Sequence, residues 1–395
     1  MCSDFQTTAQ ELWQRAPGLH YAQPGERPDV GVDNDRLYEL VKFLWQKQLE
    51  QVEWPAALRT LYAQQMDAGF IRDDLSAVNH FQCYNADQAA RFIGMYNPRR
   101  AERGSGAGRK TPPRGAQTAD APDASCYLCL DNVRWQQCGV QIPFQVRVNQ
   151  HPYAVLCNPF PFAPLHTTIA SAGHEPQMWQ APQDRDAMLK ARRIAADVYA
   201  LAQKLPGFVV FYNGVGAGAT IEKHLHFHAF EAPKSQQPFP LQMAAQAAAR
   251  AVGARAPAVL DVGIQDALYP LGAFRLSGGQ EEVVGNAIAL CANWDKLLGE
   301  DATANIIGLT EDEQTVLYFI PRNRHFTHSP GMAGIPGGLE ALGVFVFSTP
   351  AEAQAIGEQK VTFEYMRRIL EAVKPPRDLG RLRASVSGGG AVTRL

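Results

Sequence analysis

The stretch Asn213 to Phe230 reads NGVGAGATIEKHLHFHAF, and its pattern decides the structure predicted for the surrounding chain. Three histidines, His224, His226 and His228, alternate with apolar residues. Because a β-strand sends successive side chains to opposite faces, the three imidazoles are predicted to share one face of a strand. The apolar residues between them would then pack on the other face.

A glycine-rich turn comes directly before this predicted strand. Gly214, Gly216 and Gly218 can adopt backbone angles closed to other residues, and they let main-chain N–H groups approach an anion. Imidazole has an unperturbed pKa of about 6.5, so it offers an unprotonated nitrogen that can attack phosphorus near pH 7. His226, in the middle, is best placed to attack, because an imidazole on each side can donate a hydrogen bond or bind a metal.

Two other interpretations fit the same histidines. A histidine in an apolar strand is most often an ordinary core or surface residue, and three in alternation can form a metal site of the kind found in zinc hydrolases. The glycine turn attached to the strand favours phosphate chemistry over both.

The stretch around the three histidines resembles the active-site strand of a known superfamily. HLHFHAF resembles the histidine-triad motif, and YNGVGAGATIEKHLHFHAF resembles the active-site strand of the GDP-hexose phosphorylases. The similarity to galactose-1-phosphate uridylyltransferase and diadenosine tetraphosphate phosphorylase is looser. The resemblance implies an α+β fold of antiparallel sheets with packed helices, in two related lobes. It also implies that His226 is the nucleophile, that His228 hydrogen-bonds phosphate or the departing oxygen, and that Asn213 contacts phosphate.

Two departures from the family pattern bear on the reaction. The transferases and phosphorylases usually carry glutamine where this chain has His228, which is typical of the histidine-triad hydrolases. One residue more separates Thr220 from His224 than in the GDP-hexose phosphorylases, so Thr220 is a weaker candidate for substrate binding.

The resemblance implies nucleotidyl transfer through a covalent nucleotidyl-histidine. The expected enzyme is a phosphorylase or transferase that acts on a nucleoside diphosphate sugar or a dinucleoside polyphosphate. Its partners would be the nucleotide and a phosphate or sugar-phosphate acceptor. A hydrolase that uses water, and a nucleotide-binding sensor without turnover, remain the alternatives. The base, the sugar, the acceptor and the choice between monomer and homodimer stay open.

A metal site is the second implication. Cys126 and Cys129 form a single CxxC pair, which is a weak signal by itself. In zinc-containing members of the superfamily, a CxxC pair, a later histidine and the first triad histidine close a tetrahedral site, and Cys126, Cys129, His166 and His224 occur in that order. Four protein ligands leave no position for water, so the expected zinc is structural.

Further binding residues follow from the same resemblance. Asn158 resembles an asparagine that contacts the nucleotide in the uridylyltransferase. The segment MYNPRR resembles one in relatives of that enzyme, which makes Asn97 and either Arg99 or Arg100 candidates for phosphate binding. Polar candidates in the second predicted lobe have no assigned role: Arg322, Arg324, His325 and His328.

Composition excludes several classes of protein. The 395 residues carry 37 basic and 39 acidic side chains, a net charge of −2, so nothing draws the whole molecule to nucleic acid or to an anionic membrane. No apolar run approaches the ~20 residues that cross a bilayer, and the N-terminus lacks a signal-peptide pattern, so a cytoplasmic protein is expected. Seven cysteines, an odd number, do not indicate a disulfide framework.

Periodicity and turn residues divide the chain. The predicted segments are an irregular leader (1–34), a helical segment (35–100), a flexible linker (101–125), a catalytic lobe (126–239), a degenerate second lobe (240–380) and a disordered tail (381–395). Helices are predicted near 35–45, 58–62, 183–203, 241–252, 282–298 and 362–373, and two strands around Glu311–Glu313.

Overall fold

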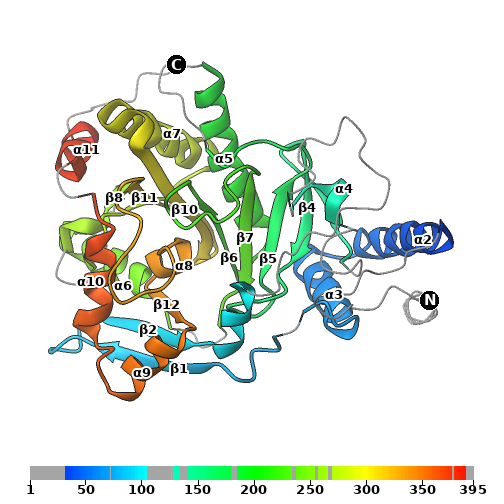
Figure 1. The fold of residues 1–395 in the computed structure, drawn as a ribbon. Coiled ribbons are helices and arrows are strands. Elements are labelled where there is room, and N and C mark those ends of the chain that lie inside the picture. Colours follow the sequence, from blue (N-terminus) through cyan, green and yellow to red (C-terminus); the bar gives the residue numbers. More distant parts are fainter. Residues whose placement is uncertain are drawn as a thin grey trace. The chain divides into compact units, whose positions relative to one another are not determined.

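The protein is represented by a computed structural model (Figure 1). The structure describes residues 32–71, 73–104, 126, 128–133, 141–178, 185–233, 237–253, 257–265, 269–375 and 378–387. The chain forms two compact units, each assembled from separate sequence segments. The first contains Met1–Ser76, Arg99–Pro176 and Lys223–Phe230, and the second contains Ala77–Pro98, Gln177–Glu222 and Glu231–Leu395. Most of the predicted leader and linker lies outside the described residues.

The first unit combines helices with four antiparallel strands. The strands neighbour one another in the order β3 (Phe144–Val148), β4 (His151–Cys157), β5 (Thr167–Ser171) and β7 (His226–Glu231). The helices are α2 (Val32–Leu49), α3 (Trp54–Asp67) and the short α4 (Leu130–Val133), and η1 (Pro98–Gly104) is a 3₁₀ segment.

Helices α2 and α3 form where the sequence predicts amphipathic helices. Val41, Trp45 and Leu49 recur every four residues on α2 and are at most 1 % exposed. Helix α3 has proline in its first turn, where the missing N–H costs no hydrogen bond, and it buries Leu58 and Leu61. Both helices therefore contribute a continuous apolar stripe to the core of this unit.

The register of β5 and β7 determines which face the histidines occupy. Thr168 lies opposite His228, and Ala170 lies opposite His226. Directly opposite residues share a face of an antiparallel sheet, so both imidazoles lie on one face and Phe227 lies on the other. This confirms the predicted alternation for His226 and His228, whereas His224 precedes the first residue of β7.

The second unit contains a larger antiparallel sheet and a smaller mixed one. The larger sheet orders β6 (Phe208–Asn213), β10 (Ala302–Glu311), β11 (Gln314–Asn323), β9 (Phe274–Leu276) and β8 (Val259–Asp261). The smaller one places β2 (Arg91–Tyr96) between antiparallel β1 (Asn79–Tyr84) and parallel β12 (Val344–Phe347).

Helices cover these sheets on the sides that carry apolar residues. Helices α5 (Arg185–Lys204) and α7 (Gln280–Leu298) pack together and against β10 and β11 (Figure 1). The remaining helical segments are α6 (Pro240–Val252), α8 (Gly338–Ala341), α9 (Pro350–Gly357), α10 (Phe363–Ala372), α11 (Asp378–Ser387), η3 (Val262–Gln265) and η4 (Gly299–Asp301).

The α+β class with antiparallel sheets and packed helices is confirmed, and the relation of the two lobes as half-repeats stays a prediction. The structure differs from the sequence interpretation at the C-terminus, where α11 continues to Ser387 although the chain from residue 381 was expected to be a tail. Leu379 and Leu382 are buried one helical turn apart, and Arg383 pairs with Asp261 at 2.8 Å, so this segment has a packed face.

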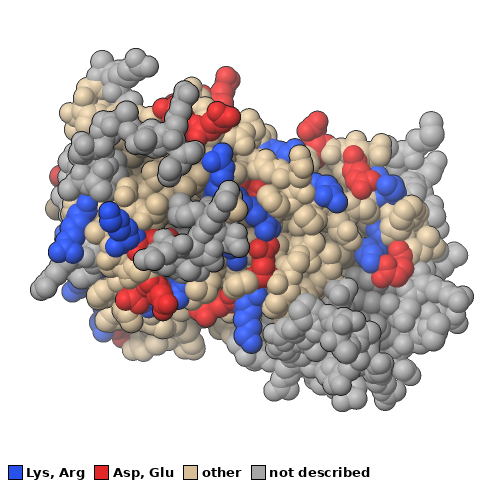
Figure 2. All heavy atoms as spheres, turned by 90° about the horizontal axis from the view of Figure 1, so that it is seen from above, with Lys and Arg blue, Asp and Glu red and all other residues tan. Residues whose placement is uncertain are grey.

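Surface charge agrees with the near-zero net charge. On the face that Figure 2 shows, acidic and basic side chains are interspersed over the described atoms. Within the described chain, no helix has the length and apolar character that a membrane span requires.

Candidate functional site

The first unit holds His226 in a defined orientation. Its ring is 1 % exposed, and its Nδ1 lies 2.8 Å from the backbone oxygen of His224. A carbonyl oxygen only accepts, so the proton of a neutral His226 ring is on Nδ1. The lone pair is therefore on Nε2, and the fold selects one tautomer of this imidazole.

His228 lies beside His226 and is contacted by a third histidine. The His226 and His228 rings meet edge to face, with centroids 5.1 Å apart. His166 Nε2 lies 3.1 Å from His228 Nδ1. His166 is 1 % exposed, and its ring packs against Phe162 in a tilted arrangement with centroids 3.8 Å apart. One face of the first unit thus carries three neighbouring imidazoles, of which His228 is the most exposed.

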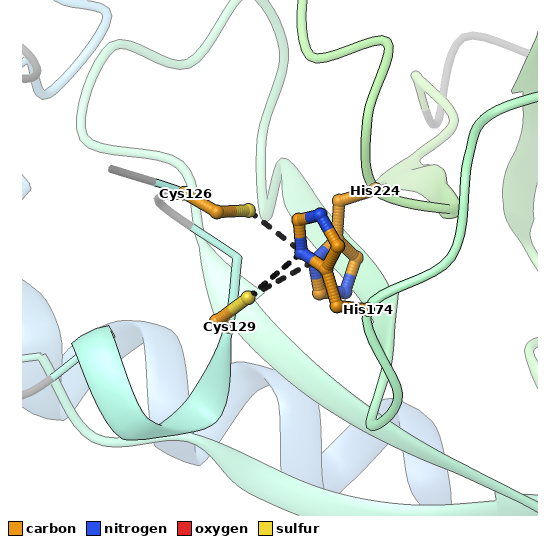
Figure 3. Close-up of side chains that lie close together, drawn as sticks. All are labelled: Cys126, Cys129, His174 and His224. Carbon is orange, nitrogen blue, oxygen red and sulfur yellow. Dashed lines mark hydrogen bonds between the residues drawn. The ribbon is translucent and has the colours of Figure 1, made fainter. Parts of the chain in front are cut away.

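A second cluster joins two cysteines and two histidines (Figure 3). Cys126, Cys129, His174 and His224 each point one ligand atom inward, and these four atoms lie within 4.8 Å of one another. His224 Nδ1 is 3.3 Å from the sulfur of Cys126 and 3.6 Å from that of Cys129, and His174 Nδ1 is 3.0 Å from the sulfur of Cys129.

The chemistry of this cluster fits zinc. Sulfur and nitrogen ligands bound tetrahedrally to Zn²⁺ lie about 3.3–3.8 Å apart, close to the distances between these atoms. A hydrogen bond from Cys129 lowers the pKa of the Cys126 thiol, with a further contribution from His224 and against the effect of burial, which favours the thiolate that metals bind. His224 Nε2 lies 2.8 Å from the Ser171 oxygen, a bond that directs Nδ1 into the cluster.

The fourth residue of the cluster is His174 and not the predicted His166. The sheet register gives the reason. Ala170 pairs with His226 in the antiparallel sheet. If this register is continued, residue 172, just after β5, is at the level of His224, whereas His166, just before β5, is at the level of Phe230. His174 follows just beyond the end of β5 and so reaches His224, and His166 instead faces His228. Cys126, Cys129 and His224 meet as predicted.

The other residues predicted to bind the substrate contact groups within the protein. The Asn158 Oδ1 accepts a hydrogen bond from the Phe160 N–H at 3.0 Å, which closes the turn before β5. Arg100 donates to the Phe160 oxygen at 2.7 Å, and its guanidinium lies 5.2 Å from the Phe162 ring centroid. Arg99 forms an exposed pair with Asp74 at 3.2 Å. Asn97 belongs to the second unit, where it is 0 % exposed and donates its N–H to the Phe347 oxygen.

The glycine turn, residues 214–218, follows β6 in the second unit. Gly214 donates its N–H to the Ala304 oxygen, and Ala217 donates to the Gly214 oxygen, both at 2.9 Å. Gly216 and Gly218 have φ angles of +75° and +101°, which only glycine adopts at low cost. Among the described residues, the N–H groups of Gly216 and Gly218 have no protein acceptor. These two amides and that of Val215, but not those of Gly214 and Ala217, are therefore donors that the turn can offer to an anion. Thr220 follows the turn in an exposed position.

Replacing Gly218 with alanine is expected to destabilise the protein by about 2–4 kcal/mol, because the new Cβ collides with the Gly337 backbone and the positive φ is strained. Gly207→Ala is the matched control: its φ is +81°, but no atom lies within 4 Å of the added Cβ. That variant should lose only about 1 kcal/mol. Urea unfolding measures both, and equal losses would show that the close packing at Gly218 contributes nothing.

Asn213 is held at the end of β6 by its side chain. The Asn213 Oδ1 accepts hydrogen bonds from Asn305 Nδ2 and from the Gly338 N–H, each at 2.8 Å. Two donors on one atom identify that atom as oxygen, so Nδ2 is the other end of the carboxamide. Asn213 Nδ2 lies 3.1 Å from the place that a Cβ on Gly218 would take, so its donors border the turn.

The polar candidates of the second predicted lobe have different environments. Arg322 is 0 % exposed, and its Nη1 donates to the Asn305 Oδ1 at 3.0 Å. Arg324 contacts the Met178 sulfur at 3.8 Å. His325 forms an exposed pair with Asp301 at 3.0 Å, and His328 Nδ1 lies 2.7 Å from Thr327 Oγ1.

Comparison with known proteins gives a fold but no close sequence relative. A family model described as a domain of unknown function, DUF4922, matches residues 74–231. No curated protein matches the sequence. The crystal structure of yeast Ap4A phosphorylase Apa2 is similar with a TM-score of 0.50 and 14% identity, over 80% of this chain and 94% of that one. The same yeast enzyme in complex with Ap4A matches with a TM-score of 0.49 and 13% identity, over 81% and 96% of the two chains. The fold expected from the histidine-triad resemblance is thus confirmed.

Proposed function

We propose that the protein transfers a nucleotidyl group through a covalent bond to His226. The observation that carries this proposal is the 2.8 Å contact between His226 Nδ1 and the His224 oxygen, which leaves the lone pair on Nε2. A nucleophilic imidazole needs that lone pair, and a fixed tautomer removes the need to reorganise the proton before attack.

The proposed reaction has two displacements at one phosphorus. The Nε2 lone pair of His226 forms a bond to the α-phosphorus while the bond from phosphorus to the departing oxygen breaks, and His228 donates a hydrogen bond to that oxygen or to phosphate. An acceptor oxygen then attacks the same phosphorus and His226 leaves, which restores the free imidazole. Two in-line steps retain the configuration at phosphorus.

The glycine turn is proposed, from the sequence resemblance, to bind phosphate oxygens of the substrate. Only five residues, Ala219–Lys223, separate the turn from His224 in the sequence. The N–H groups of Gly216 and Gly218 and the Nδ2 of Asn213 are the donors suited to the charge that develops on these oxygens. Thr220, Asn158, Asn97 and Arg99 stay candidates for substrate binding through the sequence resemblance. The side chains of Asn158 and Arg99 also contact Phe160 and Asp74 within the protein.

A dinucleoside polyphosphate is the preferred substrate class. The fold is similar to that of a yeast Ap4A phosphorylase, which supports such a substrate over a nucleoside diphosphate sugar. Inorganic phosphate is then the preferred acceptor. Hydrolysis is the second candidate, favoured by histidine in place of glutamine at position 228.

Zinc is proposed for the cluster of Cys126, Cys129, His174 and His224, whose donor atoms suit it. When bound, the ion supplies structural cross-linking and no open coordination position for the reaction. The residues of the cluster would fasten the segment around Cys126 to the start of β7.

Incubation with Ap4A labelled at the α-phosphate tests the proposal. The quenched protein is expected to carry an acid-labile, alkali-stable label, as a phosphoramidate should. With unlabelled Ap4A and inorganic phosphate, a phosphorylase yields ADP as one product, whereas a hydrolase gives the same products with or without phosphate. A protein that binds Ap4A but never acquires label and releases no product would be a nucleotide sensor, and the proposal would fail.

A further inference from the structure

A buried arginine stands at the beginning of a hydrogen-bond chain that ends at the glycine turn. Arg322 on β11 is 0 % exposed and donates from Nη1 to the Asn305 Oδ1 at 3.0 Å and to the Pro336 oxygen at 2.9 Å. Asn305 on β10 is also 0 % exposed, and its Nδ2 donates to the Asn213 Oδ1 at 2.8 Å and to the Ala217 oxygen at 2.6 Å. The chain of contacts therefore runs from β11 through β10 to the end of β6.

The charge of Arg322 is not matched by a carboxylate in contact. Among the described residues it forms no ion pair, and its Nε and Nη2 are buried without an acceptor. Burial lowers the pKa of Arg322 to about 10, while Tyr269 and Glu340 act on it in the opposite direction, so the guanidinium remains charged at neutral pH. The groups that accept hydrogen bonds from Arg322 are uncharged, and Glu340 acts on it without contact. Burying the charge in this way is costly, which indicates that the position has a use other than stability.

Arginine fixes which atoms donate and which accept along this series of hydrogen bonds. A guanidinium has donors and no acceptor, so Asn305 must turn its oxygen toward Arg322 and its nitrogen toward Asn213. Asn213 must then turn its oxygen toward Asn305, and the Gly338 N–H, 2.8 Å from the same oxygen, agrees with this. What remains is the Asn213 Nδ2, which borders Gly218 and Gly337.

We propose that Arg322 is a positioning residue that orients the Asn213 carboxamide, through Asn305, so that its N–H groups face a phosphate at the glycine turn. Arg322 also holds the Pro336 oxygen, next to Gly337, whose Cα packs against Gly218. The same side chain thus supports both segments that border the Asn213 Nδ2. This inference rests on the phosphate-binding role proposed for the turn.

Asn305→Asp is the deciding variant. The new carboxylate pairs with Arg322 but cannot donate to Asn213 or to the Ala217 oxygen. The Asn213 carboxamide loses the bond that orients it and either turns its Nδ2 inward, at the expense of the bond from the Gly338 N–H, or becomes less ordered. Affinity for AMP and for inorganic phosphate, measured by calorimetry on the folded variant, is expected to fall by at least about tenfold. The melting temperature should also fall, because the carboxylate of this variant cannot donate to the buried Ala217 oxygen. Wild-type affinity in Asn305→Asp would overturn the inference.

Three further variants keep the test decisive if that one does not fold. Arg322→Met removes the donor and should bind AMP about tenfold more weakly, and Arg322→Lys keeps a charged donor and should recover most of that loss. Arg275→Lys is the matched control, because Arg275 belongs to the same sheet and pairs with Glu311 at 2.9 Å. Equal AMP affinities in folded Arg322→Met and wild type would contradict the inference even if stability falls.

Labelling at His226 separates this inference from the proposed function. If the wild type binds AMP and responds to these substitutions but never acquires label from Ap4A, the nucleotidyl-transfer proposal fails and the role of Arg322 stands. If label forms at His226 and the affinity for AMP is the same as wild type in Asn305→Asp, Arg322→Met and Arg322→Lys, only the inference on Arg322 fails.

Discussion

His226→Ala is expected to reduce turnover of Ap4A by about 10⁴-fold or more, because the two-step path requires a ring nitrogen bonded to phosphorus. Label transfer to the protein should disappear, whereas AMP affinity should change little. His226→Gln preserves polarity and volume but has no comparable nucleophile, so it should fail as completely. Single-turnover kinetics with labelled Ap4A measures the chemical step directly.

His151→Ala is a suitable control for that experiment. His151 begins β4 in the same unit and belongs to neither histidine cluster. Its replacement should leave the labelling rate within about twofold, as is usual for a substitution away from the reacting groups. The nucleophile is misassigned if His226→Ala still acquires label, and His228, the more exposed neighbour, would then be the next residue to test.

Removing the cysteine ligands is expected to produce the largest change in stability. Cys126→Ser should reduce bound zinc from about one ion per chain to a small fraction, and it should lower the melting temperature by about 10 °C or more, because binding free energy at a closed site contributes to folding. Metal analysis and calorimetry on the purified protein measure the two effects. Cys157→Ala, at a buried cysteine outside the cluster, is the control that should retain zinc.

The histidine ligand can be identified in the same way. His174→Ala should lose zinc as Cys126→Ser does, while His166→Ala should retain it, since His166 contacts His228 and Phe162 instead. Zinc retention in His174→Ala and loss in His166→Ala would restore the ligand set predicted from the sequence. Unchanged zinc in Cys126→Ser would exclude the site altogether.

Local sequence patterns were sufficient to predict the histidine strand, the first helix and the hairpin. The alternation around His226 and His228 reflects strand geometry, and Val41, Trp45 and Leu49 recur at helical spacing, so both could be predicted without tertiary information. The hairpin of β10 and β11 was predicted from the strand-like runs on either side of Glu311–Glu313. The structure places Asp312 and Glu313 at its tip, with positive φ angles.

Contacts that depend on strand pairing could not be obtained from local pattern. The choice between His166 and His174 depends on which end of β5 lies beside His224, and only the pairing register of β5 with β7 decides it. Asn213 is a similar case, because its orientation depends on Asn305 and Gly338, which are more than 90 residues away. Helix α11 was not predicted, because its buried residues Leu379 and Leu382 are too few to show a helical period and lie in a short segment that contains glycine and serine.

One residue connects the two clusters of the first unit. The side chain of His224 belongs to the Cys–His cluster, while its backbone oxygen holds the Nδ1 of His226 at 2.8 Å. With zinc in place, anything that disturbs the thiols, such as an oxidant or a competing chelator, would reach the reactive ring through a single peptide group. If the proposed functions of both clusters hold, removal of zinc by a chelator is expected to slow label transfer to His226 as well as to lower the melting temperature.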